Sequence, residues 1–165
     1  MAITRAKKES LLKATTEALA NAVSVVFVSF KGITVHEIND LRNALRAEGV
    51  KYTVVKKTLL KKALTEKGYA GEMPELPGEV AYAYLPAGDD VTAPARTLQG
   101  FVKKLQGKLV FLGGVLDGKY LSQVETVGVA TIPPTPVLRG MFANIINSPI
   151  QRFAIALSEV TKKTV

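Results

Sequence analysis

The segment over residues 30–64 constrains the fold most, because it predicts a strand end, a capped helix, a second strand and a further helix with few spare residues. Thr34 and Glu37 have the spacing of a capping box, in which each side chain accepts a hydrogen bond from the other residue's backbone N–H. Apolar residues recur at helical spacing over the next three turns, and Gly49 supplies the left-handed residue that commonly ends a helix. Residues 50–54 then alternate between apolar and polar, which is typical of a strand.

A lysine-rich helix is predicted after this strand. Its apolar residues share one side of a helical wheel, and the opposite side carries Lys57, Lys61 and Lys62. Residues 51–67 contain six lysines and a single acidic residue, and like charges at this density repel one another unless an anion gathers them. A phosphate backbone would be such an anion. The alternative is a solvated helix face whose lysines only aid solubility.

The composition allows a proper core and places the positive charge in one part of the chain. Of 165 residues, 47% are apolar and the mean hydropathy is +0.17, which suits one large domain or two small ones. The formal net charge of +8 is unevenly distributed, since residues 1–70 carry 13 basic and 6 acidic groups whereas residues 71–130 carry 5 and 7. We therefore expect the anion-binding surface within residues 1–70.

An apolar run over residues 25–28 is typical of a strand that is covered on both faces of a sheet. It follows a predicted basic amphipathic helix at residues 4–22. The order helix, strand, helix, strand, helix indicates an α/β (α+β) fold, in which residues 1–70 form a basic core unit built as a mixed α/β layer.

A second, smaller α/β unit is predicted over residues 79–130, after a hinge of prolines and glycines at residues 68–78. This unit is net acidic. Short strands are expected on either side of Gly113-Gly114, followed by a hairpin turn at Asp117-Gly118. The basic and acidic units would be packed together or hinged within one N-terminal domain, residues 1–132.

Residues 135–165 predict a long amphipathic helix at the end of the chain, because apolar residues recur there at helical spacing with few charges between them. Pro149 lacks a backbone N–H and crowds the preceding turn, so a kink or a break is expected near it. An apolar stripe on a projecting helix needs a partner helix. The alternative is an ordinary core helix that folds back on the second unit.

Catalytic chemistry has little support in the sequence. The absence of cysteine excludes disulfides and thiolate nucleophiles, and it fits a reducing cytosol. His36 is the only histidine, and no nucleophile stands beside it. We recognise no Walker loop, dinucleotide fingerprint or metal-ligating cluster, and no secretion signal or membrane-spanning stretch. We therefore expect a soluble protein with no cofactor, no bound metal, no membrane association and no enzymatic activity.

The stretch over residues 25–64 resembles the signature of the large-ribosomal-subunit protein ten family, the bacterial stalk-base scaffold. Members show an apolar strand, an aromatic-Arg-Gly-Leu-Thr turn, a Leu-Arg pair on a helix and a Val-Val-Lys-Asn-Thr-Leu segment. Here these segments read Phe30-Lys31-Gly32-Ile33-Thr34, Leu41-Arg42 and Val54-Val55-Lys56-Lys57-Thr58-Leu59. Lys31 replaces the usual arginine and lacks its planar fork. Lys57 replaces the usual asparagine, which should raise phosphate affinity at the expense of the hydrogen bonds of that amide.

The resemblance implies a cytoplasmic ribosomal scaffold without chemistry of its own. Residues 1–132 would bind large-subunit ribosomal RNA at the GTPase-associated region, beside large-subunit protein eleven. The C-terminal helix would hold dimers of the acidic stalk protein, which recruit translational GTPases, and its short length favours two dimers. The residues expected to contact RNA are Lys31, Gly32, Thr34, Arg42, Lys56, Lys57, Thr58, Lys61 and Lys62, with Arg5, Lys7 and Lys8 as an auxiliary arm. Those expected to contact the stalk dimers are Phe142, Ile145, Ile146, Ile150, Phe153, Leu157 and Val160.

Two other classes of function stay open at this point. A free-standing RNA chaperone or translational regulator would use the same basic domain without an acidic protein partner, and its C-terminal apolar stripe would be buried in the isolated protein. An enzyme acting on an anionic substrate would need a pocket with a perturbed acid or base, for which the sequence offers only His36 and scattered carboxylates.

Overall fold

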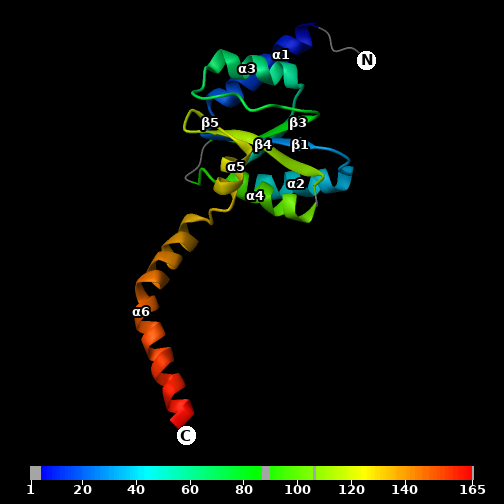
Figure 1. Ribbon diagram of the computed structural model, residues 1–165. Helices are drawn as coiled ribbons and strands as arrows, with labels where there is room; N and C mark the ends of the chain where they lie inside the picture. Colours follow the sequence, from blue (N-terminus) through cyan, green and yellow to red (C-terminus); the bar gives the residue numbers. More distant parts are fainter. Residues whose placement is uncertain (1–4, 87–89, 106, 165) are drawn as a thin grey trace. The chain divides into compact units, whose positions relative to one another are not determined.

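The structure is a computed structural model that describes residues 5–86, 90–105 and 107–164 (Figure 1). The chain forms two compact units, one ending at Ile132 and one starting at Pro133. The helices and strands are α1 (Arg5–Ala20), β1 (Ser24–Phe30), α2 (Val35–Ala47), β2 (Lys51–Val54), α3 (Lys57–Lys67), β3 (Val80–Leu85), α4 (Ala93–Lys104), β4 (Leu109–Leu116), β5 (Lys119–Leu121), α5 (Gln123–Ala130) and α6 (Thr135–Thr164). The predicted α/β (α+β) class with a C-terminal helix is confirmed.

The strands of the first unit form one five-stranded sheet in the order β2-β3-β1-β4-β5, and every pairing is antiparallel. β1 and β2 are consecutive in the sequence, yet β3 lies between them and pairs with both. The predicted division into a basic unit (1–70) and a smaller acidic unit (79–130) is therefore corrected, because the strands of both stretches share this sheet. The two stretches differ in charge, but backbone hydrogen bonds join strands whatever charges their side chains carry.

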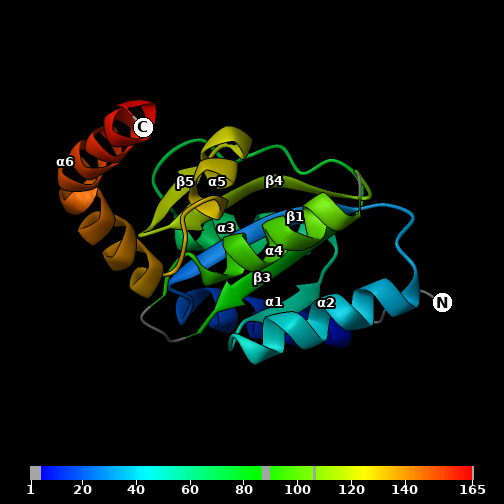
Figure 2. The same cartoon turned by 90° about the horizontal axis from the view of Figure 1, so that it is seen from below.

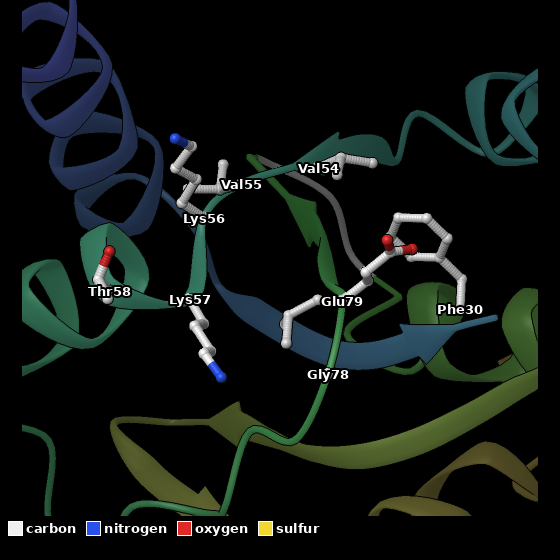
Figure 3. A pocket seen from close by; sticks show the side chains of 9 residues that line it. Phe30, Val54, Val55, Lys56, Lys57, Thr58, Gly78 and Glu79 are labelled. Carbon is white, nitrogen blue, oxygen red and sulfur yellow. The ribbon is translucent and has the colours of Figure 1, made fainter. Parts of the chain in front are cut away.

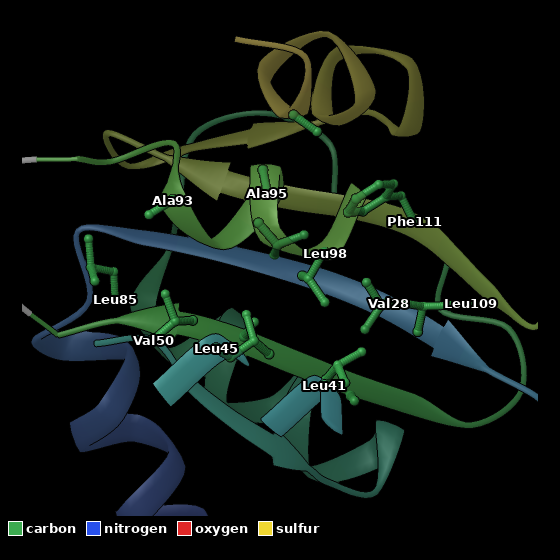
Figure 4. Close-up of a cluster of buried hydrophobic side chains, with 14 residues drawn as sticks. Val28, Leu41, Leu45, Val50, Leu85, Ala93, Ala95, Leu98, Leu109 and Phe111 are labelled. Atoms are coloured by element: carbon green, nitrogen blue, oxygen red, sulfur yellow. The ribbon is translucent and has the colours of Figure 1, made fainter. Parts of the chain in front are cut away.

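Helices cover both faces of the sheet (Figure 1, Figure 2). α1 and α3 lie on one face, and α2, α4 and α5 lie on the other. On the second face, Leu41 of α2 and Leu98 of α4 pack in one cluster with Val28 of β1 (Figure 4). On the first face, Leu60 of α3 shares a cluster with Phe27 of β1. Neighbouring residues of β1 thus point into different cores, which explains the unbroken apolar run that predicted a strand buried on both faces.

The predicted capping box at the start of α2 is present. Thr34 Oγ1 accepts a hydrogen bond from the Glu37 N–H at 3.4 Å, and Glu37 Oε2 accepts one from the Thr34 N–H at 2.7 Å. A second capping box, formed by Ser122 and Glu125 at the start of α5, was not predicted. The same Ser-x-x-Glu spacing in the sequence could have revealed it. Gly49, which follows α2, has the predicted left-handed conformation with φ of +73°.

Gly113 and Gly114 lie inside β4 rather than between two short strands, which corrects the predicted strand boundaries. The β1–β4 register shifts beside them, so the sheet is irregular at this point. A Cβ atom on Gly114 would lie only 2.8 Å from the carbonyl oxygen of Val25, so the missing side chain lets β4 approach β1. The predicted turn at Asp117-Gly118 is confirmed, with positive φ at both residues, and it joins β4 to β5.

The second unit contains a single helix, α6, which spans 30 residues and curves along its length (Figure 1). Of the kink or break predicted near Pro149, the break is absent, because the helix continues through this residue. Proline removes one backbone N–H, so only the hydrogen bond to the Ile145 carbonyl is lost while the bonds on either side remain. No helix in the described ranges has the length and apolar composition needed to cross a membrane.

Replacing Gly114 by alanine should lower the free energy of unfolding by about 1–3 kcal/mol, because the added methyl group would meet a backbone oxygen inside the sheet. Gly128→Ala on α5 is the matched control, since its added methyl group would face open space; it should raise the free energy of unfolding by up to about 1 kcal/mol. Urea unfolding of the two variants measures the difference. Equal stabilities would contradict the close approach of β4 to β1.

Glu37 should make the stability of the protein depend on acid pH. Hydrogen bonds from the backbone and hydroxyl of Thr34, together with the Lys108 ammonium, lower the pKa of Glu37 from its ordinary 4.5 to about 2. A pKa lowered by folding stabilises the folded state above pH 4.5, and this contribution is lost as the pH falls through about 2.

Thermal unfolding between about pH 2 and pH 6 measures this contribution. The acid-dependent part of the stability should shrink in Glu37→Gln and persist in Glu75→Gln, which changes an exposed glutamate on the loop before β3. The same acid dependence in wild type and Glu37→Gln would show that the capping box does not hold the carboxylate in its charged form.

Candidate nucleic-acid interface

The exposed side of α3 carries the lysines that its sequence pattern predicts. Leu60 and Leu64 are 0% exposed and face the sheet. Lys57, Lys61 and Lys62 are exposed on the other side. Because the buried leucines fix the helix against β1, the lysine stems start from fixed positions, although each ammonium group remains free to move on its flexible chain.

A groove of about 620 Å³ lies where β2 passes into α3, and we call it the β2–α3 groove. Three segments that are distant in the sequence build it: the end of β1, the β2–α3 junction and the start of β3. Its lining residues are Phe30, Val54, Val55, Lys56, Lys57, Thr58, Gly78, Glu79 and Val80. Figure 3 shows Lys56, Lys57 and Thr58 on one side of the groove and Phe30 and Glu79 on the other.

Some of the residues that line the groove were predicted to contact RNA, and others were not. Lys56, Lys57 and Thr58 are among the residues predicted to contact RNA, and the structure places them together. Phe30 and Glu79 were not predicted. Phe30 opens the signature turn, so its position in the sequence could have indicated it. Glu79 had no such signal, because it reaches the groove only through the insertion of β3 between β1 and β2.

A second cavity, of about 480 Å³, lies at the opposite end of β2, and we call it the Arg42 cavity. It is lined by Arg42, Arg46, Lys51, Tyr52 and Thr53. Of these only Arg42 was a predicted RNA contact; Arg46 stands one helical turn later on the same face of α2, a spacing that could have indicated it. Burial raises the pKa of Tyr52 to about 12, against a smaller lowering by the Arg42 charge, so its hydroxyl keeps its proton at neutral pH.

The turn between β1 and α2 holds three predicted RNA contacts with different local roles. Lys31 is exposed, and its backbone N–H donates to the Lys108 carbonyl at 2.9 Å. Gly32 has φ of +67°, a conformation that favours glycine, and the position of its missing side chain faces open space. The Thr34 hydroxyl bonds to Glu37 within the capping box, so any contact of Thr34 with RNA would compete with this bond.

The predicted auxiliary arm belongs to α1, which packs beside α3 on the same face of the sheet. Lys7 and Lys8 are exposed on α1. The side chain of Arg5 lies outside the part of the chain whose side chains are described. A hydrogen bond of 3.4 Å from Thr16 to Glu66 joins the two helices. The arm is thus on an element adjacent to the lysine helix.

Catalytic and metal-binding arrangements find no support in the described residues. His36 has 87% of its side chain exposed and lies 3.7 Å from Asp40, one turn along the same helix. No group of three or more histidine or carboxylate side chains within the described ranges could hold a metal ion. The cationic groups that line the two hollows are lysine and arginine side chains.

The apolar stripe of α6 is exposed. All seven predicted contact residues expose between 53% and 70% of their surface; they are Phe142, Ile145, Ile146, Ile150, Phe153, Leu157 and Val160. Leu138 is also exposed and extends the stripe towards the start of the helix. Ile155 is 59% exposed, but helical spacing places it on the other side of α6. Because α6 is the only helix or strand among the described residues of the second unit, no other described element of that unit covers the stripe.

Comparison with known proteins identifies relatives over almost the whole chain. The family model described as Ribosomal protein L10 matches residues 3–103. This range includes every residue that lines the β2–α3 groove or the Arg42 cavity. Large ribosomal subunit protein uL10 of Staphylococcus carnosus (strain TM300) is 35% identical over 153 residues, 93% of this chain and 90% of the relative. The protein of the same name from Staphylococcus aureus (strain Newman) is 34% identical over 159 residues, 96% of this chain and 93% of the relative.

The family model covers more than half of the chain, and the relatives are similar along nearly their full length. The resemblance suggested by residues 25–64 is thereby confirmed. The chain belongs to the ribosomal protein L10 family, whose members are structural, non-enzymatic components of the large ribosomal subunit.

Proposed function

We propose that this chain is a scaffold that binds large-subunit ribosomal RNA on its first unit and holds dimers of the acidic stalk protein on α6. The observation that carries the proposal is the convergence of the signature segments around β2. The three signature segments are separate in the sequence, yet each contributes to these hollows: Phe30 and residues 54–58 line the β2–α3 groove, and Arg42 lines the Arg42 cavity. We call these two hollows and the lysine side of α3 the RNA surface.

Electrostatic attraction supports RNA as the ligand of this surface. Lys57, Lys61 and Lys62 project from a helix whose other side is buried, so their mutual repulsion is offset by apolar packing and is relieved when phosphates bind. Arg42 and Arg46 add planar guanidinium groups that can each contact a phosphate through two hydrogen bonds. Such contacts fix the position of the protein on the RNA without reading its sequence.

The position on the ribosome follows from the family signature. We infer binding at the GTPase-associated region of large-subunit ribosomal RNA, beside large-subunit protein eleven. Translational GTPases would reach the scaffold indirectly, through the stalk dimers. Lys31 and Lys57, which replace the usual arginine and asparagine, would contact phosphate as point charges.

The exposed stripe of α6 supports a helical protein partner. Burying one phenylalanine or isoleucine of the stripe would contribute about 1.5–3 kcal/mol. Five phenylalanine and isoleucine residues, one leucine and one valine recur at helical spacing over residues 142–160, and a partner that presents its own apolar helices can cover them. The length of this stripe favours two stalk dimers over three.

The alternative function is that of a free-standing RNA-binding regulator or chaperone. It would use the same RNA surface but would need no acidic partner. Membership of a ribosomal family favours the scaffold, and the non-enzymatic character of that family removes the enzyme hypothesis. The two remaining functions differ in one measurable property, the capture of stalk dimers by α6.

Replacing Lys57, Lys61 and Lys62 together by glutamate should abolish binding to a transcript of the GTPase-associated region while leaving stalk-dimer binding unchanged. The corresponding alanine variant should bind more weakly and should flatten the slope of log K against log salt concentration by about two to three units, since up to three phosphate contacts are lost. Fluorescence anisotropy over a salt series measures both effects.

The matched control is a second triple variant that makes the same change of charge outside the RNA surface. Lys103, Lys104 and Lys119 are exposed residues that line neither the β2–α3 groove nor the Arg42 cavity. Replacing these three by glutamate should weaken RNA binding far less than the α3 variant does. An equal loss in both triple variants would show that only net charge, and not this surface, determines RNA affinity.

Phe153→Asp should weaken the capture of stalk dimers by at least about tenfold and leave RNA binding unchanged, because it places a charge in the centre of an apolar contact. Gln151→Asp adds the same charge to the other side of α6 and should have little effect. Native mass spectrometry of the full-length protein mixed with acidic stalk protein measures the assembly.

Wild-type protein should appear as one scaffold with two dimers, and Phe153→Asp should lose at least one of them. Folded wild-type protein that captures no acidic subunit would overturn the scaffold function and leave the free-standing RNA-binding regulator. If the α3 and α6 variants damaged both activities equally, the assignment of separate surfaces would fail.

A further inference from the structure

A carboxylate lies in the basic β2–α3 groove, although a negative charge weakens the binding of phosphate there. Glu79 lines the groove together with Lys56 and Lys57. Its negative charge opposes phosphate binding at this site. None of the ion pairs within the described residues joins Glu79 to either lysine, so the carboxylate is not simply neutralised by a salt bridge. Its oxygens accept hydrogen bonds only, so a matching ligand must present donors to them.

The wall beside Glu79 is apolar and aromatic. Phe30 and Glu79 lie on the same side of the groove (Figure 3), and Val54, Val55 and Val80 supply further apolar lining. Phe30 is half-buried, so part of its ring contacts the core while the rest lines the groove. Gly78 adopts φ of +72° in the turn that brings Glu79 to this position.

We propose that the β2–α3 groove receives one unstacked guanine base of the bound RNA. The base would stack on Phe30, its Watson–Crick edge would donate to the Glu79 carboxylate, and its flanking phosphates would contact Lys56 and Lys57. This inference rests on the proposed RNA-binding function and adds a base-reading site to it. A groove of about 620 Å³ lies within the range of roughly 300–1,000 Å³ found for small-molecule sites, so one nucleotide fits.

Guanine is selected by the donor pattern of its Watson–Crick edge. It presents two adjacent donors, N1–H and the N2 amino group, which match the two oxygens of one carboxylate. Adenine and cytosine present a single amino group beside a ring nitrogen that accepts, and uracil presents a single N–H between two carbonyl oxygens. An acceptor-only carboxylate therefore pairs with both donors of guanine and repels part of the edge of each other base.

A protein side chain is the competing occupant. An arginine from a partner could also pair with Glu79 and stack on Phe30. Lys56 and Lys57 stand across the same groove, however, and would repel a guanidinium while attracting a phosphate. The charges around the groove thus favour a nucleotide, which combines a neutral base with an anionic backbone.

Glu79→Gln tests the inference through the sign of its effect on RNA affinity. Removing a negative charge from a phosphate-binding surface should by itself strengthen binding. If the carboxylate holds a guanine, the variant should instead bind the GTPase-associated-region transcript about tenfold more weakly, because one base-edge pair is lost. Glu75→Gln is the matched control: it removes the same charge from an exposed position outside the groove and should leave binding unchanged or slightly stronger.

Chemical probing locates the base. A dicarbonyl reagent that modifies N1 and N2 of unpaired guanines should show one guanine that wild-type protein protects and Glu79→Gln leaves reactive. Replacing that guanine by inosine removes the N2 amino group and should weaken wild-type binding about tenfold, while Glu79→Gln should bind both transcripts equally. Phe30→Leu keeps the apolar volume but loses the flat ring, and it should also weaken binding several-fold while its thermal unfolding shows a folded protein.

The RNA affinities of wild-type protein and of Glu79→Gln decide whether the guanine site exists. If Glu79→Gln strengthens RNA binding as Glu75→Gln does, or if inosine has no effect on wild-type affinity, the guanine site is overturned and the groove is left to a protein side chain or to solvent. If wild-type protein does not bind the transcript at all, the proposed RNA-binding function itself fails. The two failures are therefore distinguished by the wild-type affinity alone.

Discussion

Backbone pairing along both edges of β1 is the interaction on which the first unit depends. β1 lies between β3 and β4, and its side chains alternate between the two cores. The pairing with β4 requires glycine at Gly114, because a side chain there would meet the Val25 carbonyl oxygen. All five helices of this unit are then placed by the faces of the sheet that they cover. The position of the lysine helix α3 is a consequence of this pairing, not of its own charge pattern.

The RNA surface forms at an edge of this sheet. β2 is an edge strand, so within the described part of the chain no further strand pairs with its outer side. One end passes into α3 and borders the β2–α3 groove, and the other borders the Arg42 cavity beside α2. Because α2 and α3 lie on opposite faces, a short edge strand connects basic groups from both sides of the sheet. Anions that approach this edge meet lysine from one helix and arginine from the other.

The two proposed contacts depend on different forces. The RNA surface carries mobile ammonium and guanidinium groups, so its affinity should fall steeply with salt. The α6 stripe consists of exposed aliphatic and aromatic side chains, whose burial depends on area and is nearly independent of salt. Since the stripe and the RNA surface belong to different compact units, each can be changed without removing the packing that supports the other.

The sequence by itself determined the local elements, the family and the chemical character of both surfaces. The Thr34–Glu37 capping box and the buried side of α3 depend on residues within a few positions of each other, so their spacing is sufficient to predict them. Only the tertiary structure decided that β3 enters between β1 and β2, that α6 continues through Pro149, and that Glu79 and Lys57 line the same groove. Strand partners are chosen by packing across the whole sheet, and every residue except proline offers the same backbone donor and acceptor. Local sequence patterns therefore cannot predict which strands pair with each other.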